Sequence, residues 1–211
     1  MFQKYRPVWE EINLDNLLYN IGQIKSKIGD KELVGVIKAD AYGHGAVEVA
    51  EVLLEAGINR FAVAVLEEAI ELRKNKVEVP IMVLGIIPDA FLDEIIDYDI
   101  EPIVPSYDYA DKLFKLAQGK DKKIKVHIAL DTGMGRIGFP IESDSVEEIS
   151  KISKLPNMEI QSLFSHFSTA DEVDKAYSYE QFKKYELLYE ELIKKNVKIN
   201  MRTISNSAAI M

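Results

Sequence analysis

The chain has 211 residues, of which 47% are hydrophobic and 29% are charged, and its formal net charge is −9. This composition supports a sizeable core, excludes a disordered tail, and makes nucleic acid or an anionic membrane a poor default partner. The chain has no cysteine, three histidines, no transmembrane-length apolar run and no signal-peptide core, so we expect a cytoplasmic protein without a disulfide framework or a metal site.

Short apolar runs alternate with helical patterns along the whole chain. Apolar residues recur at helical spacing over Leu14–Ile28. Seven near-continuous apolar runs follow, typical of parallel strands buried on both faces: Leu33–Ile37, Phe61–Val65, Ile81–Leu84, Ile100–Val104, Ile124–Leu130, Ile160–Phe164 and Met201–Ser205. Between them lie predicted helices at Val47–Ala56, Leu66–Lys74, Asp89–Ile96, Tyr107–Leu116, Ser145–Ile152 and Tyr179–Lys195. Asp89 and Ser106 are suited to cap two of these helices.

This alternation is compatible with a doubly wound parallel sheet or a (β/α)8 barrel. The strands show no obvious reversal of order, so we predict an α/β fold of the TIM-barrel type, incomplete, with about seven of eight strands. No linker or composition shift divides residues 1–211, which we treat as one domain. In such a barrel the functional residues follow the carboxyl ends of the strands.

A lysine ends the first predicted strand. Lys38 directly follows an apolar run and precedes the turn Ala39–Gly45. Burial there favours the neutral amine that Schiff-base chemistry needs, whereas the alternative is a lysine whose stem lies along the core rim while its ammonium group reaches solvent. Tyr42 and the glycines of the turn suit either an anion-binding loop or a plain turn. We interpret Asp40 and His44 as solvated loop residues.

The fifth predicted strand runs into a glycine-rich loop. Gly133, Gly135 and Gly138 match the spacing of the dinucleotide-binding pattern, but no helix pattern opens at once and the next strand does not end in an acid. We therefore interpret this segment as a loop that lets backbone approach a ligand and that presents Arg136. A surface arginine on a flexible loop is the open alternative.

Two further strand ends carry polar groups. His166 follows the sixth strand and could act as a base or pack on an aromatic ligand, although a lone histidine there is more often a structural rim residue. The seventh strand leads into Ser205–Ala209, which suits either an anion site or an ordinary helix cap. His127 lies within the fifth strand and is interpreted as structural.

The motifs at these strand ends resemble the alanine racemase family. A lysine, an arginine, a histidine and a phosphate-like cradle facing one barrel mouth suit a phosphorylated carbonyl cofactor held as an imine. The matching segments follow family order and spacing, at Trp9–Ile12, Val36–Gly45, Asp131–Arg136, Ser165–Phe167 and Asn206–Ala209. The resemblance implies a pyridoxal-phosphate enzyme that interconverts L- and D-alanine and supplies D-alanine for peptidoglycan. It also implies an N-terminal (β/α)8 barrel, a C-terminal β domain and a head-to-tail homodimer.

The resemblance implies roles for single residues as well. Lys38 would form the imine with the cofactor and act as the base on one face of the substrate carbon. Arg136 would contact the cofactor's phenolic oxygen, and His166 would lie beside its pyridine ring. The other implied cofactor-binding positions are Tyr42 and Ser207 at the phosphate, Asn206 beside it and Leu84 in the apolar wall.

Two departures from the family pattern carry consequences. Some relatives have a carbamylated lysine two residues before the position of Asp131, where this chain has Ala129. We therefore expect another group or an ion to support Arg136, or a looser arginine. The chain ends at Met211, so we expect the eighth strand, an arginine facing the pyridine nitrogen, the β domain and the opposite-face tyrosine base to be missing, and this N-terminal portion not to be fully active alone.

Three alternatives remain open from the sequence. The chain could be a non-catalytic barrel that binds pyridoxal phosphate, or a racemase of serine or another small amino acid. It could also be a lysine-imine aldolase barrel, which would have no use for a phosphate cradle at Tyr42 and Ser207. In each case an open seven-strand barrel would leave its first and last strands with unpaired edges, which favours association.

Overall fold

The computed structural model describes residues 8–211. Residues 1–7, which begin the segment that was searched for a signal peptide, lie outside the described residues. The described strands are β1 Gly35–Val36, β2 Phe61–Val63, β3 Ile81–Val83, β4 Glu101–Pro102, β5 Ile124–Asp131, β6 Phe139–Pro140, β7 Met158–Phe164 and β8 Met201–Thr203. The helices are α1 Leu14–Ile28, α2 Lys38–Gly43, α3 Ala46–Glu55, α4 Leu66–Lys74, α5 Leu92–Asp97, α6 Tyr107–Gly119, α7 Ser143–Ile152, α8 Ala176–Lys194 and α9 Ser207–Ile210. None of the described helices is long and apolar enough to cross a membrane.

The predicted strands and helices are all present, with three short additions, α2, β6 and α9. Helices α1 and α4 have the predicted bounds, and Ser106 caps α6 by accepting a hydrogen bond from the Tyr109 N–H, as expected. The predicted cap at Asp89 is wrong. Asp89 lies inside a 3-10 turn that begins after Pro88, and its carboxylate pairs with Lys112 at 2.5 Å instead.

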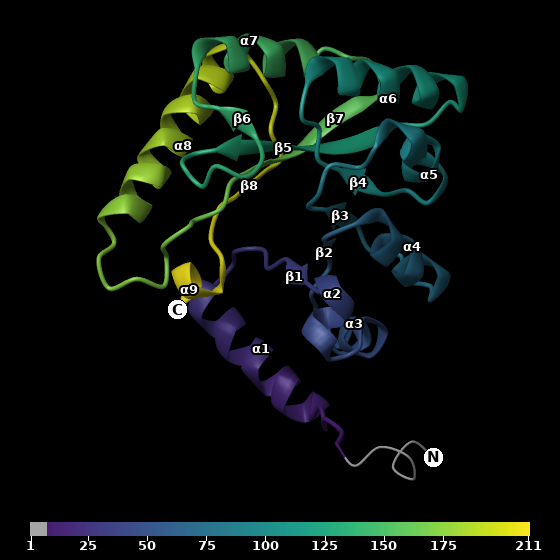
Figure 1. Ribbon diagram of the computed structural model, residues 1–211, viewed down its shortest axis with the longest axis vertical. Helices are drawn as coiled ribbons and strands as arrows, with labels where there is room; N and C mark the ends of the chain where they lie inside the picture. The colour runs from purple at the N-terminus through teal and green to yellow at the C-terminus, as the bar shows by residue number, and fades with distance from the viewer. Residues whose placement is uncertain (1–7) are drawn as a thin grey trace.

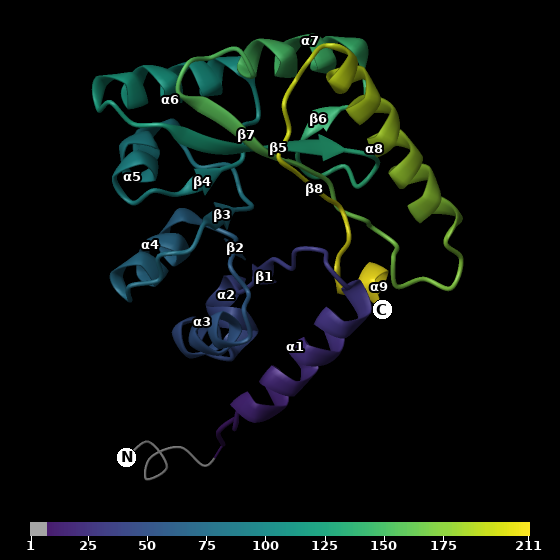
Figure 2. The same cartoon turned by 180° about the vertical axis from the view of Figure 1, so that it is seen from behind.

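All strand pairs are parallel, and the strands form a barrel wall in two four-stranded sheets, β1-β2-β3-β4 and β6-β5-β7-β8. The sheets meet where Ile103 bridges His127 and the Val104 N–H donates to the His127 carbonyl at 3.0 Å. Apart from the short β6, neighbours in space follow chain order, which distinguishes this barrel from a doubly wound sheet. Figures 1 and 2 show the strands curving together, with the longer helices on the outside.

The wall is open between its first and last strands within residues 8–211. Each of β1 and β8 has one strand neighbour there, as the seven-strand prediction required. Helix α9 contacts α1 near this opening, and the Lys27 ammonium donates to the Met211 carbonyl. No second, β-rich domain is found in the described residues.

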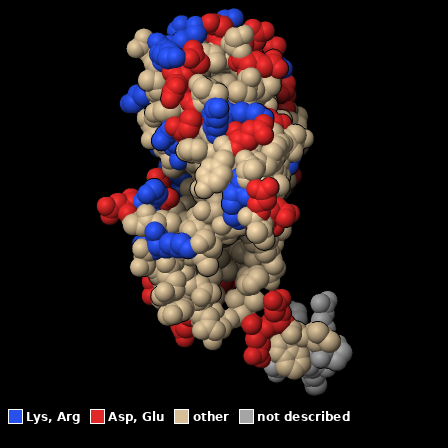
Figure 3. Space-filling model, turned by 90° about the vertical axis from the view of Figure 1, so that its left-hand side faces the viewer, with Lys and Arg blue, Asp and Glu red and all other residues tan. Residues whose placement is uncertain are grey.

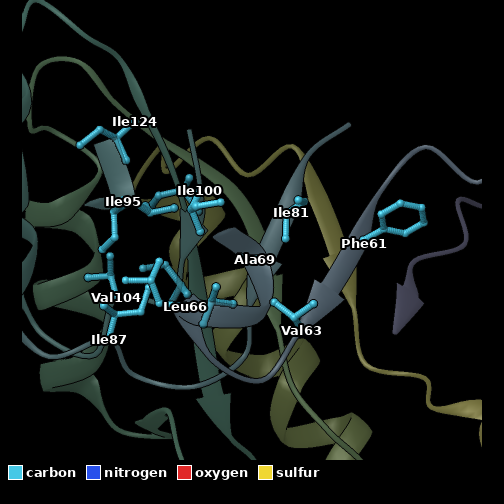
Figure 4. Packing of buried hydrophobic residues seen from close by; sticks show 14 of the residues in the cluster. Phe61, Val63, Leu66, Ala69, Ile81, Ile87, Ile95, Ile100, Val104 and Ile124 are labelled. Atoms are coloured by element: carbon cyan, nitrogen blue, oxygen red, sulfur yellow. The ribbon is translucent and has the colours of Figure 1, made fainter. Parts of the chain in front are cut away.

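Side chains alternate between the two faces of the wall, because successive residues of a strand point in opposite directions. Phe61 and Val63 belong to the large cluster between the strands and the outer helices, which Figure 4 shows at close range. Ala62, between them, belongs to a smaller inner cluster, whose buried members are Ala62, Met82, Ile103 and Ala129. The buried members of the inner cluster come from β2, β3 and β5 and from the residue directly after β4.

A buried polar network joins β4, β5 and β7 to the residue before β2, and it confirms His127 as structural. The His127 ring is fully buried, with Nε2 3.0 Å from a Glu101 carboxylate oxygen and Nδ1 2.6 Å from the Ser162 hydroxyl. Arg60, just before β2, pairs with the same Glu101 oxygen. These groups satisfy one another's hydrogen bonds inside the barrel.

Candidate functional site

Lys38 lies two residues after the end of β1, at the start of the unusual turn labelled α2. The lysine is half-buried, beside Ile37, which is 2% exposed. The next four residues, Ala39–Tyr42, all have left-handed backbone, with φ between 51° and 58°. Left-handed helical backbone costs roughly 1–2 kcal/mol for each residue that is not glycine. Such a turn persists only where surrounding contacts hold it.

Polar contacts from neighbouring elements hold this turn. A carboxylate oxygen of Asp40 accepts the Ala46 N–H at 2.7 Å, which satisfies the start of α3. Glu68 of α4 accepts the Ala39 N–H at 2.6 Å. Asp40 and His44 are both exposed, in agreement with their interpretation as solvated loop residues.

The loop after β5 folds back on its own strand. One carboxylate oxygen of Asp131 accepts the N–H groups of Gly133 and Gly135, at 2.9 and 3.0 Å. Gly138 has φ 124°, and a Cβ there would lie 2.7 Å from the Asp131 nitrogen, so the close approach requires glycine. Strand β6, rather than a helix, follows Gly138, which confirms that the glycine spacing is not a dinucleotide fingerprint. The loop carries Arg136, which is exposed.

Arg136 and His166 line one pocket, although they come from the ends of two different strands. The pocket is lined by Leu130, Asp131, Met134, Arg136, Ile137, Phe164 and His166. Burial lowers the pKa of His166, and the positive charges of Arg136 and Lys38 lower it further. Arg136 and His166 thus lie together at the carboxyl ends of two strands, and Lys38 is near enough for its charge to act on the His166 ring, although Lys38 does not line the pocket.

Residues of helix α8 form hydrogen bonds to the loops after β5 and β7, and the sequence pattern did not predict these contacts. The Gln181 side chain is fully buried. Its amide oxygen accepts from the N–H and the hydroxyl of Ser168, at 3.0 and 3.1 Å, and its NH2 group donates to the His166 carbonyl at 3.1 Å and the Thr132 hydroxyl at 3.3 Å. The Tyr177 hydroxyl donates to the Gly133 carbonyl at 2.7 Å. The helical pattern of α8 gives no signal for these contacts, because polar residues on a helix are normally solvated.

The other predicted cofactor-binding residues lie at neighbouring strand ends but do not line the pocket. Tyr42 is 60% exposed, and Ser207 is the exposed first residue of α9. Asn206 caps α9 by accepting the Ala209 N–H at 3.0 Å, and its NH2 group lies 3.3 Å from the Phe167 carbonyl, which joins the loops after β7 and β8. Leu84 packs against the inner apolar cluster.

Arg136 has no ion-pair partner within the described part of the chain. The position of the carbamylated lysine is taken by Ala129, which is 1% exposed in the inner apolar cluster. Residues 8–211 contain no cluster of His, Asp or Glu side chains that could hold a metal ion. On the face shown in Figure 3, acidic and basic side chains are intermixed.

Comparisons with known proteins give consistent matches. The family model described as alanine racemase, N-terminal domain, matches residues 12–211. An alanine racemase of Clostridium kluyveri is 85% identical over the whole chain, which covers 54% of that relative. A solved alanine racemase of Clostridium difficile 630 superposes with a TM-score of 0.95 at 44% identity, over 98% of this chain and 55% of that one.

A more distant solved structure, a histidine racemase from Leuconostoc mesenteroides, superposes with a TM-score of 0.84 at 28% identity, over 93% of this chain and 52% of that one. The chain thus spans about half the length of the relatives that it matches. The parallel barrel, the glycine-rich loop after β5 and these matches agree with one another. The chain belongs to the alanine racemase family, and residues 12–211 correspond to its N-terminal domain.

Proposed function

We propose that this chain is the barrel part of a pyridoxal-phosphate-dependent alanine racemase, with the barrel domain at residues 1–211. The observation that supports the proposal is the meeting of three strand ends at one mouth. Arg136 and His166 line the same pocket, and Lys38 is near enough for its charge to lower the pKa of His166.

The groups at the mouth suit the chemistry of this cofactor. A half-buried primary amine, a guanidinium and exposed hydroxyls are the partners that an aldehyde, a phenolic oxygen and a phosphate would need. The cofactor, when bound, would make the α-hydrogen of an amino acid acidic. Tyr42, Asn206 and Ser207 would hold its phosphate, and Leu84 would contribute the apolar wall.

Lys38, Arg136 and His166 would each have a separate role toward the cofactor. Lys38 would attach the cofactor and take or return a proton on one face of the substrate carbon. Arg136 would hold the phenolic oxygen through charge-assisted hydrogen bonds. His166, whose pKa is lowered by burial and by the charges of Arg136 and Lys38, would pack beside the cofactor's ring.

Alanine is the proposed substrate, and its D-isomer would serve peptidoglycan synthesis in the cytoplasm. A head-to-tail homodimer is the proposed assembly of the whole protein. Serine or another small amino acid remains the second substrate candidate, because a racemase of a much larger amino acid, histidine, shares this barrel. The barrel alone therefore does not decide which side chain is accepted.

Cofactor capture tests the proposal directly. The chain is mixed with pyridoxal phosphate, scanned for a visible absorbance band, reduced with borohydride and digested for peptide mass spectrometry. We expect the adduct on Lys38 and loss of the band in Lys38→Ala, whereas Lys31→Ala, which changes an exposed lysine before β1, keeps both. Labelling spread evenly over the surface lysines would reject the proposal.

A second measurement separates racemisation from binding without turnover. The relatives are nearly twice as long as this chain, and the family resemblance assigns the opposite-face base to their other half. We therefore expect the 211-residue chain to capture the cofactor without full two-way racemisation of alanine. Two-way exchange of the alanine α-proton with deuterated water would contradict that expectation, and capture without exchange in the full-length protein would favour the non-catalytic barrel.

A further inference from the structure

The turn after Lys38 is unfavourable by itself, so the direction of Lys38 depends on what holds the turn. Four consecutive residues that are not glycine, Ala39–Tyr42, have left-handed backbone. The backbone hydrogen bonds within the segment include those from the Ala41 N–H to the Ile37 carbonyl and from the Gly45 N–H to the Asp40 carbonyl, at 3.0 Å each, and one from the His44 N–H to the Ala41 carbonyl at 3.2 Å. These bonds do not reach the Ala39 N–H, which is the first donor after the lysine.

Glu68, which belongs to the next β/α unit, accepts a hydrogen bond from the Ala39 N–H. Its Oε1 accepts the Ala39 N–H at 2.6 Å, while Oε2 accepts the N–H groups of Ala64 and Val65 at 2.7 and 3.2 Å. Glu68 is half-buried in the first turn of α4. One carboxylate therefore joins the loop after β1 to the loop after β2, with bonds to a charged acceptor that are stronger than neutral ones.

We propose that Glu68 is a positioning residue for Lys38, which holds the left-handed turn so that the lysine faces the barrel mouth. The inference rests on the proposed function of Lys38. A plain helix-capping role would need only the bonds to Ala64 and Val65, because Val65 is the N-cap residue of α4 and Ala64 precedes it. It would not need the bond to Ala39, which lies 29 residues away in the sequence.

The two carboxylate oxygens make the substitution Glu68→Gln informative. A glutamine side chain has one acceptor oxygen and one donor NH2 group. It can accept from Ala39 or from the start of α4, but not from both, and its NH2 group would then face another N–H donor. Glu67→Gln is the matched control, because Glu67 is the exposed preceding residue on the same helix.

The test measures the turn and the lysine separately. The turn is followed by hydrogen exchange of the Ala39 amide, and the lysine by the pH profile of its borohydride-trapped labelling with pyridoxal phosphate. We expect Glu68→Gln to speed exchange at Ala39 and to slow capture at Lys38, each by about tenfold, as for the loss of one charge-assisted hydrogen bond. Glu67→Gln should change neither. Unchanged exchange and capture in Glu68→Gln, with a lower melting temperature, would overturn the proposal in favour of simple capping.

A rescue experiment covers the case in which Glu68→Gln folds poorly. Glycine adopts left-handed backbone without the steric penalty, so Ala39→Gly added to Glu68→Gln should restore both folding and capture at Lys38. Failure of the double variant to recover either property would overturn the proposal. If the unsubstituted chain does not capture pyridoxal phosphate but Ala39 exchange still responds to Glu68→Gln, the proposed function fails while the holding role of Glu68 stands.

Discussion

The side-chain amide of Gln181 donates a hydrogen bond of 3.1 Å to the main-chain carbonyl of His166. The bond joins α8 to the end of β7, and the same amide also reaches Ser168 and Thr132. The loop that carries His166 and the base of the loop that carries Arg136 are therefore attached to one fully buried side chain.

This arrangement predicts that Gln181→Leu destabilises the chain. A leucine of similar size leaves the Ser168 N–H and the His166 carbonyl without their partner, at a cost of about 3 kcal/mol of unfolding free energy. Gln118→Leu, which changes an exposed glutamine on α6, is the control and should cost far less. Urea denaturation of the three proteins checks this, and equal midpoints would mean that the buried amide contributes nothing.

The pKa of His166 should rise when either neighbouring cation is removed. Burial lowers this pKa first, followed by the charges of Arg136 and Lys38. In Arg136→Gln or Lys38→Met one positive charge disappears, so protonation of the ring becomes easier, while the effect of burial remains. The pKa should therefore rise and stay below its ordinary value of 6.5. NMR titration of the ring protons measures it, and a lower pKa in either variant would contradict the charge argument.

The buried pair of Glu101 and Arg60 predicts a loss of stability in acid. Burial acts to raise the pKa of Glu101, but the hydrogen bond and charge of His127 and the charge of Arg60 outweigh it and leave the pKa lowered. Burial lowers the pKa of His127. Both groups bind protons more readily in the unfolded chain, so stability should fall as the pH drops below 6.5 and again below 4.5, the two ordinary values.

Glu101→Gln tests this network, since it removes the buried carboxylate that pairs with Arg60 and leaves that charge only its half-exposed partner Glu32. We expect Glu101→Gln to lower the free energy of unfolding by about 3 kcal/mol at neutral pH. Below pH 4.5 the free energy of unfolding should depend less steeply on pH than in the unsubstituted chain. Glu32→Gln removes a half-exposed partner of the same arginine, 3.4 Å away, and should cost under about 1 kcal/mol. Equal losses in the two variants, measured by denaturation across pH, would refute the role of burial.

The open edges of the barrel wall predict self-association. Val36 on β1 is 41% exposed, and β1 has one strand neighbour in the described residues. Val36→Lys should reduce association, because a charged edge opposes strand pairing between molecules. Val173→Lys changes a valine that is 99% exposed outside any strand and serves as the control. Sedimentation measures the species present, and a monodisperse, cooperatively melting monomer of the unsubstituted chain would contradict the prediction.

Local patterns in the sequence were sufficient for the element order and for much of the fold. The apolar spacing of Leu14–Ile28 and Leu66–Lys74 predicted two helices with their bounds, because burial of one helix face imposes that period. The cap at Ser106 was confirmed, whereas Asp89 was not a cap, because the preceding proline starts a 3-10 turn and Lys112 takes the carboxylate. Position in the chain alone could not distinguish these two candidates.

The sequence by itself determined which residues follow the strands, and from that order it predicted that Lys38, Arg136 and His166 meet at the carboxyl ends of a parallel barrel. Only the tertiary structure decided how those residues are held. The left-handed turn after Lys38 depends on Glu68, 29 residues away, and the His166 loop depends on Gln181, 15 residues away. The physical reason is that periodicity records which side of an element is buried, while the partner of a single polar group depends on how distant elements pack against each other.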